Sequence, residues 1–196
     1  MINVQNNATI APVPRRIPAG ADHVKASLRP VVTYSGTQQN ELLAALPRDV
    51  LESLFEHLEL VTLPFGKGLF EFGGTMDYVY FPTTAIVSLL YVMEDGATTE
   101  IAVVGHEGVI GVSLFDGERA MCSAVTQAAG YGYRMKTQHL RAAFSQGGAL
   151  PALLMRYNTA LFAQMAQNAV GGRHSSIEQK LCRWLLDRLD LSLIHI

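Results

Sequence analysis

The sequence predicts an α+β fold: an antiparallel β-roll or jelly roll, with short helices before it and a long helix after it. Between Leu60 and Met135, short segments rich in Val, Ile, Thr, Tyr and Phe are separated by glycine-containing turns. No helical periodicity separates these segments, so crossover helices that would connect parallel strands are not expected. Leucines at helical spacing precede and follow the β region. These observations disfavour a doubly wound α/β fold.

The composition is that of a chain with a substantial core, but its charge is distributed unevenly. Of 196 residues, 49% are hydrophobic and 16% are charged. Residues 1–40 hold four basic and one acidic residue, residues 41–118 hold two and 13, and residues 119–190 hold nine and three. Any contact with nucleic acid is therefore expected on the C-terminal side.

The first 39 residues predict a disordered tail. They hold four of the eight prolines and show no sustained helical or strand periodicity. From Asn40 onward, leucines recur at three- and four-residue steps, which predicts two short amphipathic helices. Pro47 and Asp49 suit the start of the second helix, because its first turn needs no proline N–H and favours a negative charge.

Within the β region, the clearest hairpin joins residues 85–93 to residues 98–104. The connection contains Asp95 and Gly96, a pair that favours the positive φ of a tight hairpin turn. The sequence therefore predicts two consecutive antiparallel strands here.

Helical patterns return after the strands. Residues 136–144 predict a short helix, and residues 149–175 predict a long one. The long helix carries a near-heptad row typical of a dimer seam, although the same face could pack on the chain's own roll. The seam residues are Leu150, Leu154, Tyr157, Leu161, Met165 and Asn168. Gly171 and Gly172 weaken the helix and predict a bend or hinge.

Four stretches resemble motifs of one bacterial family. Residues 66–73 resemble an early β-roll turn, residues 78–82 (Tyr-Val-Tyr-Phe-Pro) a strand, and residues 105–111 (Gly-His-Glu-Gly-Val-Ile-Gly) a glycine turn. Residues 173–186 resemble the junction that leads into a DNA-binding domain. Together with the order of elements, these stretches resemble an atypical subgroup of the Crp/Fnr family of transcription regulators.

The resemblance implies a cyclic nucleotide-binding-like fold and a division of labour along the chain. Residues 40–148 would form a β-roll effector domain, residues 149–175 a homodimerisation helix, and residues 176–190 the start of a winged helix-turn-helix domain. A signal at the roll, from a small-molecule effector in some members, would pass through the long helix to DNA-binding domains.

The resemblance also implies which residues would form an effector pocket, and it disfavours a cyclic nucleotide as the effector. The position of the family's ribose-binding glutamate follows Gly111, where this chain has Val112, whereas Arg119 matches the phosphate-binding arginine. With one of the two anchors lost, we expect neither cyclic AMP nor another cofactor. The candidate residues are Gly105, Glu107, Gly108, Gly111 and Arg119.

The last six residues, 191–196, match the translation of a transposase-based sequencing adapter. We expect this segment to be adapter-derived. On that interpretation, the parent protein continues past Asp190 into the winged helix-turn-helix domain, which would bind DNA.

Other function classes have weaker support. Cys122 and Cys182 are too few for a zinc or iron–sulfur site made of cysteines, and we expect no metal site. A cupin-like metal enzyme needs converging histidines, whereas His106 and Glu107 stand nearly alone, so we expect no enzyme. A stand-alone β-roll module that binds a ligand or partner stays open. No signal peptide or membrane-spanning stretch is evident, so we expect a cytoplasmic protein without membrane contact.

Overall fold

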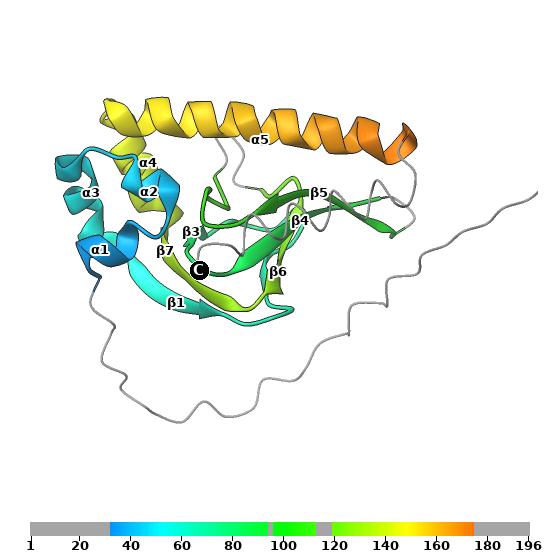
Figure 1. Cartoon of the computed structure of the whole chain (residues 1–196), viewed down its shortest axis with the longest axis horizontal. Coiled ribbons are helices and arrows are strands. Elements are labelled where there is room, and N and C mark those ends of the chain that lie inside the picture. The colour runs from blue at the N-terminus through cyan, green and yellow to red at the C-terminus, as the bar shows by residue number, and fades with distance from the viewer. Residues whose placement is uncertain (1–31, 94–95, 113–118, 175–196) are drawn as a thin grey trace, which may run out of the picture.

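The computed structural model of the protein describes residues 32–93, 96–112 and 119–174 (Figure 1). Within these residues, seven strands form two antiparallel sheets, in the orders β1-β7-β3 and β2-β6-β4-β5. The strands are β1 (Glu59–Leu63), β2 (Gly68–Phe70), β3 (Tyr78–Pro82), β4 (Ile86–Val92), β5 (Thr98–Val104), β6 (Ser123–Ala128) and β7 (Gly130–Lys136). The antiparallel roll predicted from the sequence is confirmed.

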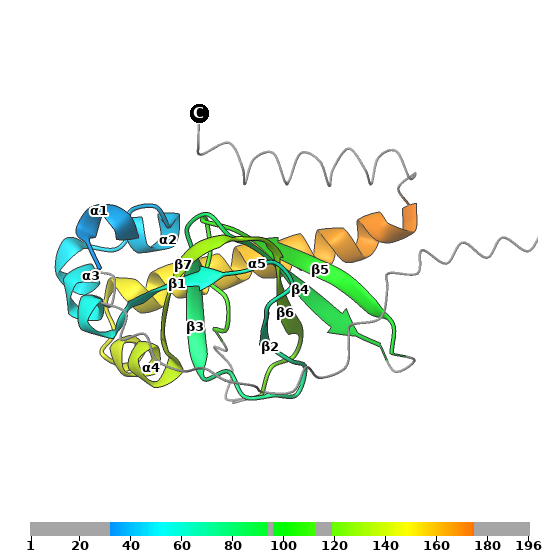
Figure 2. The ribbon, with the colours of Figure 1, turned by 90° about the horizontal axis from the view of Figure 1, so that it is seen from below.

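The helices flank the roll at one end and along one side. They are α1 (Tyr34–Thr37), α2 (Glu41–Ala44), α3 (Arg48–Leu54), the 3-10 turn η1 (Phe55–His57), α4 (Thr137–Ser145) and α5 (Ala149–His174). In both views, α1 to α4 gather beside the amino-terminal half of α5, which continues along the strands (Figures 1 and 2).

The last part of the segment predicted as a disordered tail, residues 32–39, belongs to the described structure. Residues 34–37 form α1, in which the Thr33 hydroxyl accepts a hydrogen bond from the Gly36 amide at 3.1 Å. Thr37 and Asn40 are fully buried. A single four-residue turn held by a side-chain cap has no periodicity for a sequence pattern to reveal.

The hairpin predicted between residues 85 and 104 is confirmed as β4 and β5. The strands pair from Val87 opposite Val104 to Val92 opposite Thr98. Gly96 has a φ of 83°, the positive value that this turn position demands.

Successive side chains of β3 point into two different apolar clusters. Val79 and Phe81 point into a helix-side cluster, which includes Leu43, Leu51, Met135 and Leu154. Tyr80, between them, points into a roll-interior cluster, which includes Leu63, Val87, Leu89, Ala102 and Ile110. Successive side chains of a strand face opposite sides, so a strand between two cores reads as an unbroken apolar run.

Helix α5 contacts both clusters with the residues predicted as a dimer seam. Leu150 and Leu154 are buried in the helix-side cluster, and Tyr157 packs against it. Leu161 and Met165 pack against the roll-interior cluster.

The Asn168 Nδ2 atom completes this face by donating a hydrogen bond to the Ile101 carbonyl at 3.2 Å. The near-heptad row is therefore explained by packing on the chain's own roll, the alternative that the sequence left open. The helix also continues through Gly171 and Gly172 to His174.

One buried side chain ties the N-terminal helices to the roll. Asn40 caps α2, where its Oδ1 atom accepts a hydrogen bond from the Leu43 amide at 3.0 Å. Its Nδ2 atom donates to the carbonyl oxygens of Pro82 at 2.8 Å and of Gly108 at 2.9 Å. Asn40 therefore fixes α2, the end of β3 and the turn after β5 relative to one another.

We predict that Asn40→Ala lowers the free energy of unfolding by about 2–3 kcal/mol, because it removes a helix cap and leaves two carbonyl groups without their partner. Urea unfolding followed by circular dichroism measures the change. Thr33→Ala removes an exposed cap of the same kind and is the matched control, with an expected cost of about 1 kcal/mol or less. Equal costs for the two variants would contradict the role given to Asn40.

Candidate functional site

The predicted effector-pocket residues occupy separate places in the structure. Gly105, Glu107 and Gly108 belong to one turn after β5. Gly111 lies against the start of β3, and Arg119 pairs with Thr75 in an isolated antiparallel bridge. The structure therefore brings three of the five candidates together.

The Glu107 carboxylate stabilises its own turn, which spans residues 105–108. Both of its oxygens accept from the Gly105 amide, at 2.9 and 3.1 Å. This arrangement gives Glu107 a structural role in addition to any part in ligand binding.

Neighbouring His106 connects the turn to α2. Its Nε2 atom lies 3.2 Å from Oε1 of Glu41, and its carbonyl accepts a hydrogen bond from the Glu41 amide at 2.8 Å. Together with the Asn40 bonds, these contacts hold the 105–108 turn against the N-terminal helices.

Gly108 brings the same turn into direct contact with α5. A Cβ atom on Gly108 would lie 2.4 Å from the Tyr157 hydroxyl oxygen and 2.7 Å from its ring. Only a residue without a side chain lets the aromatic ring of Tyr157 approach the backbone this closely. The turn therefore touches α2 on one side and α5 on the other.

The Tyr157 hydroxyl is buried at this contact. It lies by the backbone of Val109 but makes no hydrogen bond of ordinary geometry with the described residues. Burial raises the pKa of Tyr157, and the negative charge of Glu107 adds to the increase, while the Val109 backbone partly offsets it. A buried hydroxyl without a partner is a polar group that a small movement could pair.

Gly111 and Arg119 lie at two different places in the backbone of the roll. Gly111 has a φ of 86°, and a Cβ atom there would lie 2.7 Å from the Tyr78 carbonyl oxygen, so glycine is required. Arg119 is exposed, and the adjacent Ala120 exchanges backbone hydrogen bonds with Gly73 and Gly74, each at 2.8 Å. In this arrangement, Arg119 stands on the chain segment beside the entry to β3.

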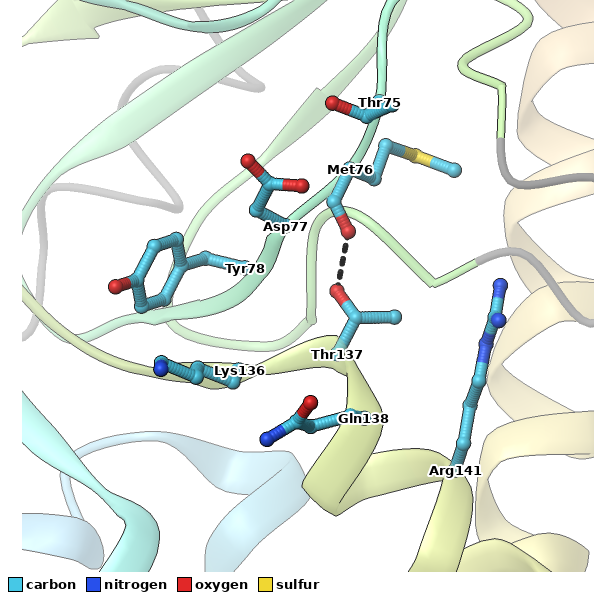
Figure 3. Close-up of a pocket in the computed structure, with 8 residues that line it drawn as sticks. All are labelled: Thr75, Met76, Asp77, Tyr78, Lys136, Thr137, Gln138 and Arg141. Carbon is cyan, nitrogen blue, oxygen red and sulfur yellow. Dashed lines mark hydrogen bonds between the residues drawn. The ribbon is translucent and has the colours of Figure 1, made fainter.

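A pocket of about 640 Å³ opens between the entry to β3 and the start of α4 (Figure 3). Residues 75–78 line one wall, and residues 136–138 with Arg141 line the other. None of the five predicted effector residues lines it. The pocket combines residues about 60 positions apart in the sequence, which no local motif could have indicated.

The described residues hold no group of three or more His, Cys, Asp or Glu side chains that could bind a metal ion. His57 and His139 stack with their ring centroids 3.9 Å apart. In the same part of the chain, no helix is long and apolar enough to cross a membrane.

Neither a known protein family nor a curated protein matches the sequence. The fold, in contrast, is shared with solved structures. A cyclic nucleotide-binding domain from Methylobacillus flagellatus matches with a TM-score of 0.60 and 17% identity, over 73% of this chain and 87% of its own. FixK2 from Bradyrhizobium japonicum matches with a TM-score of 0.60 and 14% identity, over 68% of this chain and 66% of its own.

A third similar structure is the c-di-GMP responsive global regulator CLP of Xanthomonas campestris. It matches with a TM-score of 0.59 and 14% identity, and the match covers 72% of each chain. The protein therefore has the fold of cyclic nucleotide-binding domains, as the resemblance implied.

We predict that Gly108→Ala lowers the free energy of unfolding by about 1–3 kcal/mol, because the new Cβ atom overlaps the Tyr157 ring. Gly68→Ala is the control, since a Cβ atom there meets nothing within 4 Å. In a double-mutant cycle with Tyr157→Leu, the two substitutions should couple by about 1 kcal/mol or more. Additive effects would mean that the turn and α5 do not contact each other as described.

We also predict a difference in alkaline stability between the wild type and Tyr157→Phe. Tyrosine in an unfolded chain ionises near pH 10, whereas burial raises the pKa of Tyr157 in the folded chain. The contribution of the neutral hydroxyl is fully present below about pH 10 and is lost as the pH rises further. The unfolding free energy of the wild type should therefore fall more steeply above about pH 10 than that of Tyr157→Phe. Parallel pH profiles would show that the hydroxyl is solvated.

Proposed function

We propose that the chain is the sensory and dimerising part of a Crp/Fnr-type transcription regulator. The fold of cyclic nucleotide-binding domains supports this function, as do the four stretches that resemble the family. The observation that carries the proposal is the 105–108 turn, which contacts Asn40 on one side and Tyr157 of α5 on the other. A movement of the turn would thereby be passed directly to α5 through the contact between Gly108 and Tyr157.

The signal from the roll to α5, which we call the relay, depends on the contacts that hold the 105–108 turn on both of its sides. The Asn40 bond to the Gly108 carbonyl and the Glu41 amide bond to the His106 carbonyl prevent the turn from moving apart from α2. On its other side, Gly108 leaves no space between the turn and Tyr157. An effector that shifts the turn would therefore either shift α5 with it or break buried contacts. The turn and α5 together would then form the two-state element that allostery requires.

We place the homodimer interface on the face of α5 opposite the roll. This exposed face has residues at alternating three- and four-residue steps, the spacing of a coiled-coil seam. The outer stripe consists of Ala152, Met155, Thr159, Phe162 and Ala166. Met155 is 55% exposed and Phe162 is 54% exposed. The smaller residues of the stripe, Ala152, Thr159 and Ala166, would let a second helix approach closely.

DNA binding is the part of the proposal that lies outside the described residues. The resemblance of residues 173–186 to the family's domain junction supports a winged helix-turn-helix domain that begins in residues 176–190. In that arrangement, the paired α5 helices would set the separation of two recognition helices on DNA.

We predict that Phe162→Glu converts a dimer into a folded monomer, because each copy would bury a charge in the interface. Sedimentation velocity measures the mass, and circular dichroism confirms that the fold is kept. Gln167→Glu adds the same charge to the exposed surface of α5 beside the outer stripe and should leave the mass unchanged. A wild-type chain that is monomeric at about 100 μM, or a dimeric Phe162→Glu variant, would refute this interface.

The DNA-binding part is tested by amplifying and reading the source gene across Asp190. We expect an open reading frame that encodes a basic helix-turn-helix in place of residues 191–196. A stop codon directly after Ile196 in genomic DNA would instead leave a stand-alone β-roll module.

A further inference from the structure

We propose that the pocket between β3 and α4 binds a small zwitterion with the chemistry of an α-amino acid. Two cationic side chains, Lys136 and Arg141, share its lining with one carboxylate, Asp77 (Figure 3). None of these residues belongs to the glycine turn or to the Arg119 segment that the family resemblance nominates. The pocket is therefore a separate candidate for ligand binding.

The combination of charges selects the class of ligand. The side chains of Asp77 and Lys136 are exposed at the pocket and make no hydrogen bond or ion pair with any described residue. A simple anion would be attracted by Lys136 but repelled by Asp77, and a simple cation would be attracted by Asp77 but repelled by Lys136. A molecule with a carboxylate and an ammonium group can satisfy charges of both signs.

The walls of the pocket are held in place before any ligand arrives. The Thr137 amide donates to the Asp77 carbonyl at 2.9 Å, and the Thr137 hydroxyl donates to the Met76 carbonyl. These two bonds join the entry to β3 to the first residue of α4, and Figure 3 shows the one to Met76. Pre-formed walls reduce the ordering cost of binding.

The non-charged lining suits the remainder of such a molecule. Met76 offers apolar surface, and Gln138 offers an amide that can donate and accept hydrogen bonds. A volume of about 640 Å³ falls within the usual range of small-molecule sites, so the ligand's own side chain also fits.

The pocket lies beside the Arg119 segment on one wall and beside α4, which leads into α5, on the other. Thr75, on one wall, pairs with Arg119. Arg141, on the other wall, belongs to α4, which is joined to α5 by Gly147 and Gly148, both with positive φ. Any effect of the ligand on α5 rests on the proposed function, whereas binding itself does not.

Binding is tested by thermal-shift measurements with each of the twenty proteinogenic amino acids at about 5 mM. Titration calorimetry then follows for those that raise Tm. We expect at least one amino acid to bind, and its analogues without the α-amino group or without the carboxylate to bind about tenfold more weakly. Asp77→Asn and Lys136→Gln should each weaken binding about fivefold to tenfold. Glu71→Gln and Lys67→Gln, which remove exposed charges outside the pocket, should leave it unchanged.

The proposal is overturned if no amino acid binds, if Asp77→Asn binds as well as the wild type, or if acetate binds as well as the amino acid. Sedimentation velocity with and without the bound amino acid then separates the two proposals. Binding that leaves the dimer equilibrium unchanged would support the pocket and count against its connection to α5.

Discussion

The arrangement of the candidate site depends on the buried side chain of Asn40. Its three hydrogen bonds join α2, the end of β3 and the 105–108 turn. A buried amide satisfied on both sides fixes direction as well as distance, which apolar packing alone does not. The turn is thereby positioned with Gly108 against the ring of Tyr157 in α5.

Helix α5 packs against both apolar clusters of the molecule. Its first turns complete the helix-side cluster through Leu150 and Leu154, and its later turns cover the roll-interior cluster through Leu161 and Met165. One rigid helix that closes two cores responds to a change in either. The same packing commits its inner face to the roll, which is why we propose the outer stripe as the place where a second copy would bind.

The sequence predicted local features well and the relations between distant features poorly. The β4–β5 hairpin and α4 were evident because turn residues and short-range periodicity encode them. The near-heptad row correctly marked an apolar face from Leu150 to Asn168, but an apolar pattern does not say whether the roll or a second helix covers it. Spacing also could not show that Glu107 caps its own turn, or that Asp77 and Lys136 line one pocket, because tertiary folding creates both relations.

Native-state hydrogen exchange tests the central claim, that the 105–108 turn and α5 move as one unit. Amides of the turn and of residues 153–165 are followed at increasing concentrations of denaturant below the unfolding transition. The account predicts that both groups open with the same free energy and the same dependence on denaturant. If α5 opens at a lower free energy while the turn stays protected, the helix is an independent unit and the relay through Gly108 and Tyr157 is contradicted.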